Sequence, residues 1–194
     1  MKHLFFLLSV LFFTGIAQAQ TIPTVTIPQP QFQIWMLKNL DVSTYSDGTH
    51  IPKVTDPVAW LALTTGAYCY YNNDSAQYAA TYGKLYNWYA VAGVWNVDSK
   101  KDVTQRKKLA PEGFHIPTDA EWTTLSILLC GYDLSGDRMK EAGTTHFIYN
   151  INTATNSSGF TALPGGARID YYFMLVGNFG YWWSSTEYDT YYAL

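Results

Sequence analysis

The chain has one long apolar run, and this run lies at the extreme N-terminus, from Leu4 to Ile16. Its thirteen residues rise about 20 Å as a helix, whereas the hydrocarbon core of a bilayer is about 30 Å thick. Lys2 precedes the run, and Ala17-Gln18-Ala19 follows it as a small-residue cleavage site. We therefore expect residues 1–19 to be a secretory signal peptide, with export of a mature chain that begins at Gln20 and has no membrane span.

The exported part has about 175 residues, which suits one domain with a sizeable core. The formal net charge is −3, and the one basic cluster, Lys100 to Lys108, also contains Asp102. Binding to nucleic acid needs clustered Lys and Arg to neutralise phosphates, so we expect no nucleic-acid partner. The basic cluster is interpreted as a solvated loop.

Prolines 23, 28 and 30 place a boundary before the domain. Proline cannot donate a hydrogen bond to a sheet, so residues 20–31 are expected to form a Pro/Thr linker or a lone edge strand. A single domain is then expected over 32–194, with strands at 32–37 and 40–45. Short antiparallel strands are expected again from Thr144 onward.

Helices are predicted by their start signals. Asp56-Pro57 is an N-cap followed by proline at the first helical position, which predicts a short helix to Leu63. Thr118-Asp119-Ala120-Glu121 is a capping box, and the helix that it starts should end at Gly131. Apolar spacing predicts a further helix over 84–92, and a weak helical turn over 137–142. This order of elements indicates an α+β fold.

Aromatic residues are unusually frequent, at 17% of the chain against 14% for charged residues. Their densest group is at the C-terminal end, where strand alternation would point Trp182 and Trp183 to opposite faces. One of the two is expected in the core. The other could form a platform for sugar rings or a protein partner. The candidate binding residues are therefore Trp182, Trp183, Tyr188, Tyr191 and Tyr192, with core packing plus a solvated tail as the alternative.

Six segments together resemble one family. They are IWMLKNLDVSTYSDGTHIP (34–52), AYCYYNND (67–74), YGKLYNWYAV (82–91), PEGFHIPTDAEW (111–122), GFTALPGGAR (159–168) and GYWWSSTE (180–187). In this order they look like the Fibrobacter succinogenes major paralogous domain, which occurs in exported bacterial proteins. HIPTDAEW and the later Gly-Gly also resemble, more distantly, the formylglycine-generating enzyme group.

That second resemblance implies a C-type lectin-like variant, with a few helices packed on a small, twisted antiparallel sheet. Two departures from the family pattern are visible. Ala110 stands where family members usually have a cysteine, and the chain stops at Leu194 without the expected last strand or strands. We therefore expect a C-terminally incomplete domain.

No catalytic motif is present. Formylglycine-generating chemistry requires a reactive cysteine pair, and Cys69 and Cys130 do not match those positions; a disulfide between them is left open. The histidines have no metal-binding spacing, and we expect no metal or cofactor. His115 is interpreted as a packed, hydrogen-bonded residue. Gly165-Gly166 with Arg168 is interpreted as tight backbone packing beside a structural hydrogen-bond fork.

The sequence therefore favours an exported, non-catalytic binding module, secreted or at the cell surface, whose ligand is a glycan or a protein. A structural surface component without a discrete ligand is the alternative. An enzyme of unrecognised type is the least favoured.

Overall fold

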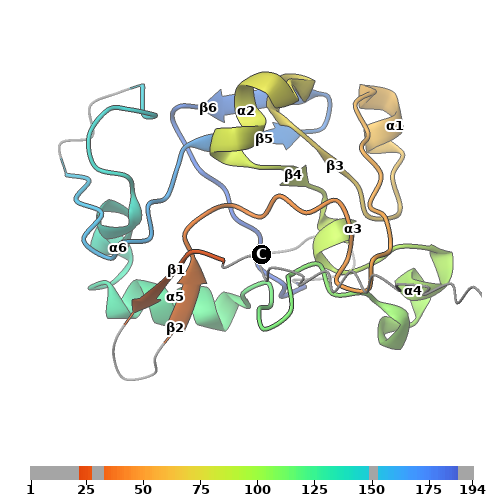
Figure 1. The fold of residues 1–194 in the computed structure, drawn as a ribbon, viewed down its shortest axis with the longest axis horizontal. Coiled ribbons are helices and arrows are strands. Elements are labelled where there is room, and N and C mark those ends of the chain that lie inside the picture. Colours follow the sequence, from red (N-terminus) through yellow and green to blue (C-terminus); the bar gives the residue numbers. More distant parts are fainter. Residues whose placement is uncertain (1–21, 28–32, 149–152, 188–194) are drawn as a thin grey trace, which may run out of the picture.

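The computed structural model describes residues 22–27, 33–148 and 153–187. Helices and strands are interspersed along these segments, so the α+β class is confirmed (Figure 1). The helices are α1 (Pro57–Leu61), α2 (Ser75–Tyr82), α3 (Trp88–Val91), α4 (Val97–Lys101), α5 (Asp119–Leu128) and α6 (Tyr132–Met139), with short 3-10 helices at Tyr71–Asn73 and Val103–Gln105. The strands are β1 (Thr24–Ile27), β2 (Gln33–Met36), β3 (Tyr68–Cys69), β4 (Leu85–Tyr86), β5 (Gly165–Ile169) and β6 (Tyr172–Val176).

The described strands form three separate antiparallel pairs, β1–β2, β3–β4 and β5–β6, rather than one sheet. Strand β1 lies inside the proline-rich stretch expected as a linker or a lone edge strand, and its Val25 pairs with Trp35 of β2. Ile27 at the end of β1 is buried, so this part of the stretch packs on the domain.

Two hydrophobic clusters hold the molecule together. The first joins β1 and β2 to α5 at one end of the ribbon in Figure 1. The second joins β3 and α3 to the loops before α1 and after α4. The buried members of the first are Ile27, Trp35, Leu125, Leu129, Phe160 and Ala162. Those of the second are Tyr45, Ile51, Tyr68, Ala90, Val91 and Leu109.

Both predicted capping signals are confirmed. The Asp56 side chain accepts a hydrogen bond from the Ala59 N–H, and α1 starts at the proline that follows it. The Thr118 hydroxyl accepts from the Glu121 N–H at 3.2 Å, and the Glu121 carboxylate accepts from the Thr118 N–H at 2.8 Å. These reciprocal bonds satisfy donors that the first turn of α5 leaves unpaired.

Three predicted elements were placed wrongly. No strand forms at 40–45, because its backbone groups bond to scattered partners, such as the Lys84 N–H that donates to the Leu40 carbonyl. The helix expected over 84–92 starts only at Trp88, since residues 85–86 pair with β3 and the Asn87 side chain caps the Ala90 N–H. The turn expected over 137–142 is the end of α6, which begins earlier, directly after Gly131.

Within the described ranges, no helix is long and apolar enough to cross a membrane. The expected signal peptide lies outside those ranges.

Candidate functional site

A cavity of about 1020 Å³ lies between the two hydrophobic clusters. Its lining includes Trp35 and Phe160 of the first cluster and Val91 and Leu109 of the second. Small-molecule sites usually measure roughly 300–1,000 Å³ and combine apolar walls with a few polar groups. This cavity is therefore large enough to hold a ligand.

Trp182 lines the cavity on the side of the first cluster. Its ring meets that of Phe160 edge-on, with 6.2 Å between centroids. Its indole N–H donates to the Asn39 side-chain oxygen at 2.9 Å. The side chain is held at both ends, yet the residue keeps 39% of its surface exposed.

Trp183 lines the same cavity on the side of the second cluster. Its ring lies 5.8 Å from that of Trp88 in α3. Its indole N–H donates to the Tyr86 carbonyl at 2.9 Å, and the residue is 40% exposed. The two neighbouring indoles therefore line one cavity but are anchored to different partners, Trp182 to Phe160 and Asn39, and Trp183 to Trp88 and Tyr86.

Strand alternation is not what separates the two rings. Residues 181–186 form no strand, so the premise that one ring faces the core and the other faces solvent does not apply. Each tryptophan is partly exposed to a similar extent. The other three candidates, Tyr188, Tyr191 and Tyr192, lie outside the described residues.

The segment that carries the tryptophans is tied to the start of α5. The Ser185 N–H donates to the Pro117 carbonyl at 2.7 Å, and the Asp119 N–H donates to the Thr186 hydroxyl at 3.0 Å. Arg106 pairs with Glu187 at 2.6 Å. Up to Glu187, the segment therefore packs on the domain and is not a solvated tail.

Two histidine–carboxylate pairs also line the cavity. His115 Nε2 lies 2.7 Å from a Glu121 oxygen, so the expected hydrogen bond is present, but the His115 side chain is 69% exposed rather than packed. His146 Nδ1 lies 2.9 Å from the Glu141 carboxylate, and both side chains are more than two-thirds buried. The sequence did not single out Glu141 and His146, because a spacing of five matches neither a helical face nor a metal motif.

The two cysteines, whose pairing the sequence left open, are free thiols. Cys69 is buried and Cys130 is exposed. Burial raises the pKa of the Cys69 thiol, and neighbouring Arg168 offsets part of that shift. In the described part of the chain, no group of three or more His, Cys, Asp or Glu side chains is arranged to hold a metal ion.

Gly166 and Arg168 have the structural role that was predicted, whereas a Cβ on Gly165 would meet nothing closer than 3.5 Å. A Cβ on Gly166 would lie 2.6 Å from the Met174 carbonyl oxygen, so the β5–β6 approach requires glycine there. The Arg168 guanidinium donates to the Val54 carbonyl at 3.1 Å and to the Thr55 carbonyl at 3.3 Å. It also lies over the Trp60 ring at 4.3 Å.

The family model described as the Fibrobacter succinogenes major domain matches residues 31–193. The chain belongs to this family. The match covers both tryptophans and both histidine–carboxylate pairs, so the cavity is built entirely from residues of the Fibrobacter succinogenes major domain. The comparisons with curated proteins and with solved structures gave no match.

Proposed function

We propose that this protein is an exported, non-catalytic binding module whose cavity receives a glycan. The observation that carries the proposal is the pair Trp182 and Trp183. Both rings line one cavity, both are anchored through their indole N–H, and both keep about two-fifths of their surface exposed.

Such rings suit sugar binding for a physical reason. One face of a sugar ring carries C–H groups that pack on an aromatic surface, while its hydroxyls require hydrogen-bond partners at the edge. Rings that are already held in place lose little conformational freedom when a ligand binds, which favours affinity. Partly buried Tyr and Trp side chains supply both an apolar body and a polar group.

The experiment is a glycan array probed with the wild type and with Trp182→Ala and Trp183→Ala. Trp95→Ala is the matched control, because Trp95 is also 40% exposed and donates its N–H to a backbone carbonyl, that of Gln105, but it does not line the cavity. We expect a selective wild-type signal that both cavity variants lose and the control keeps. Thermal melts check folding, and phenylalanine variants replace any alanine variant that unfolds. An array without selective signal would contradict the proposal, and so would equal binding by all variants.

Export is part of the same proposal. It is supported by the short apolar run and the Ala17-Gln18-Ala19 site. Expression in a Gram-negative host should give a mature chain that begins at Gln20, as N-terminal sequencing would show. Recovery from the cytoplasm with Met1 intact would refute export.

A kinship with the C-type lectin-like fold is also proposed. It is supported by the resemblance of HIPTDAEW (115–122) and Gly165-Gly166 to the formylglycine-generating group, and by the mixed α+β architecture. An experimental structure that superposes neither on C-type lectin-like domains nor on the formylglycine-generating group would overturn this kinship. The binding proposal would be unaffected.

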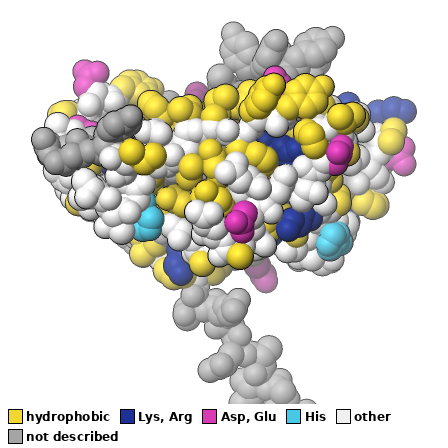
Figure 2. All heavy atoms as spheres, turned by 90° about the horizontal axis from the view of Figure 1, so that it is seen from above, with side chains coloured by type: hydrophobic (Ala, Val, Ile, Leu, Met, Phe, Trp, Pro, Cys, Tyr) yellow, Lys and Arg dark blue, Asp and Glu magenta, His cyan; other side chains and the backbone are white. Residues whose placement is uncertain are grey.

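A structural role through self-association is the second candidate. Tyr172, Phe179 and Tyr181 on and after β6 are each more than half exposed. Figure 2 shows hydrophobic side chains spread over the face that α2, β5 and β6 occupy in Figure 1, with only scattered charged groups. A sedimentation coefficient that rises with protein concentration in the wild type, but not in Tyr172→Ser, would favour this role.

A further inference from the structure

A connected row of side chains leads from Trp182 to a histidine–carboxylate pair along the cavity wall. Asn39 accepts the Trp182 indole N–H, and its own amide donates to the Tyr82 carbonyl at 3.0 Å. The Tyr82 ring meets the His146 ring edge-on, with 6.0 Å between centroids. His146 in turn contacts Glu141. All five side chains line the cavity.

This row ends in polar atoms that the described residues leave available. No described group hydrogen-bonds to the Tyr82 hydroxyl or to His146 Nε2, whereas His146 Nδ1 is occupied by Glu141. Burial, together with the negative charge of Glu141, raises the pKa of the Tyr82 phenol, so its hydroxyl stays protonated at neutral pH and can donate a hydrogen bond. The cavity that contains the partly exposed Trp182 ring therefore also offers hydrogen-bonding groups.

The charge nearest the row disfavours an anionic ligand there. Lys84 is bound to Asp41; burial opposes its charge, but hydrogen bonds to Asp41 and Tyr70, with the charge of Asp41, together outweigh burial and keep the Lys84 pKa above its usual value. The Arg168 guanidinium donates to backbone carbonyls. Lys38 and Arg168 are the lining Lys and Arg with no ion pair among the described residues; Lys38 is exposed, and Arg168 lies over the Trp60 ring. The Glu141 carboxylate lies at the end of the row itself.

We propose that the cavity takes a neutral oligosaccharide, with one sugar ring on Trp182 and hydroxyls bound by Tyr82 and the Glu141–His146 pair. This inference rests on the proposed glycan-binding function and adds the ligand's charge class and its polar contacts. The Glu141 carboxylate accepts hydrogen bonds from hydroxyls and repels carboxylates, so it also selects against acidic sugars.

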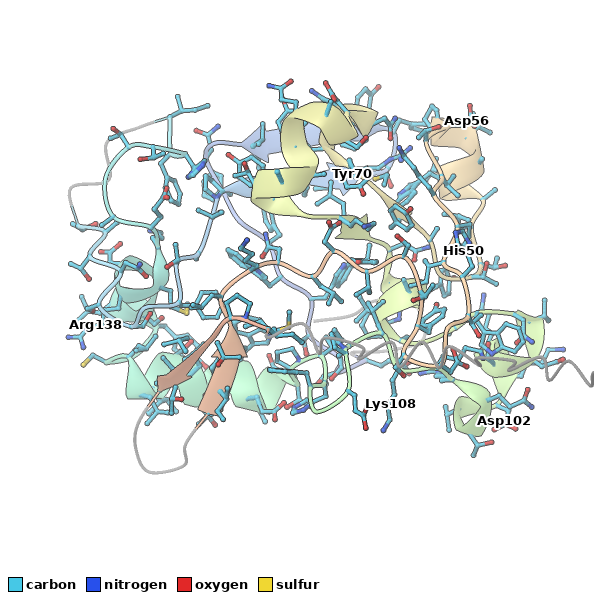
Figure 3. The ribbon with its side chains drawn as sticks, viewed as in Figure 1. His50, Asp56, Tyr70, Asp102, Lys108 and Arg138 are labelled. Carbon is cyan, nitrogen blue, oxygen red and sulfur yellow. The ribbon has the colours of Figure 1, made fainter. Side chains whose placement is uncertain are left out.

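The experiment uses titration calorimetry with neutral gluco-, xylo-, manno- and galacto-oligosaccharides, and with oligogalacturonate as the acidic match of the galactose series. His146→Ala and Glu141→Gln test the pair. His50→Ala is the matched control, because His50 is exposed and does not line the cavity. Figure 3 shows His50 at the opposite end of the molecule from Arg138 of α6, three residues before Glu141. Thermal melts confirm that each variant is folded.

We expect at least one neutral series to bind and oligogalacturonate not to bind. His146→Ala should weaken binding roughly tenfold or more, because a hydrogen bond to a ligand hydroxyl is lost. Glu141→Gln should narrow the difference between the neutral and acidic series, and His50→Ala should bind as the wild type does.

The outcomes separate this inference from the proposed function. Binding that depends on Trp182 but is unaffected by His146→Ala and Glu141→Gln, or that prefers the acidic series, overturns the inference and leaves glycan binding standing. Binding that survives Trp182→Ala, or a complete absence of sugar binding, overturns both.

Discussion

The indole N–H of Trp182 donates to the side-chain oxygen of Asn39 across 143 positions of sequence. This bond connects the C-terminal segment to the loop after β2. The Asn39 side-chain amide in turn donates a hydrogen bond to the Tyr82 carbonyl at the end of α2. The orientation of the Trp182 ring is therefore determined by residues from three distant parts of the chain. This long-range arrangement gives the cavity its exposed aromatic wall.

Gly180 is required for the same arrangement. A Cβ there would overlap ring carbons of Trp182 and would lie 2.6 Å from the Leu163 carbonyl oxygen. Gly180→Ala should therefore displace the indole, change tryptophan fluorescence and lower the free energy of unfolding by about 1–3 kcal/mol. Gly136→Ala is the control: it lies in α6, its Cβ would meet nothing closer than 3.8 Å, and it should be neutral or stabilising. An unchanged fluorescence spectrum in Gly180→Ala would show that Gly180 does not control the ring.

The α5 cap gives a prediction about stability. Thr118→Ala removes the hydroxyl that accepts the Glu121 N–H, and should lower the free energy of unfolding by about 0.5–2 kcal/mol in urea titrations. Thr118→Ser keeps the hydroxyl and should recover most of the loss. If the alanine and serine variants are equally stable, the cap does not stabilise the domain.

Glu121 predicts a loss of stability in acid. Burial acts to raise the pKa of its carboxyl, but hydrogen bonds from the Thr118 N–H and from His115 outweigh burial and hold the pKa below its usual 4.5. A carboxyl whose pKa is lowered on folding stabilises the protein above its unfolded pKa, and this contribution is lost as the pH falls through the folded value. Thermal midpoints should therefore drop below about pH 4.5. Glu121→Gln should flatten that part of the profile, and a profile identical to wild type would contradict the assignment.

Tyr45 predicts the opposite dependence at high pH. Burial, and secondarily the charge of Asp47, raises the pKa of its phenol from 10.0 to about 12. The stability that depends on the neutral phenol is complete below pH 10 and is lost between about pH 10 and 12. Among the described residues its buried hydroxyl has no hydrogen-bond partner. Tyr45→Phe should thus stabilise the protein by about 1–3 kcal/mol at neutral pH and reduce the alkaline loss. A destabilised Tyr45→Phe protein would mean that the hydroxyl has a partner.

Local signals in the sequence predicted local structure well. Thr118 with Glu121, and Asp56 with Pro57, each lie within one helical turn, so the chemistry that starts the helix is readable from adjacent residues. Helix α2 was not predicted, because it buries no residue and therefore shows no apolar face in the sequence.

The cavity could be predicted only in part. Trp182 and Trp183 were chosen because of their aromatic density, and both line the cavity, but the reason given for their separation was wrong. The Asn39 contact depends on how distant segments meet, and the Glu141–His146 pair forms within one loop at a spacing that matches no periodic pattern. Tertiary packing decides such contacts, whereas capping is decided by neighbouring residues.

The most direct test of the central claim follows the tryptophan indole N–H resonances in a proton–nitrogen NMR spectrum during titration with a neutral oligosaccharide chosen from the array. Single Trp→Phe variants assign the Trp182, Trp183 and Trp95 signals. The Trp182 and Trp183 signals should shift and saturate together, because both rings line the cavity, while the Trp95 signal should stay in place. Sugar binding that moves Trp95 or other signals but leaves Trp182 and Trp183 unchanged would place the binding site elsewhere and contradict the account.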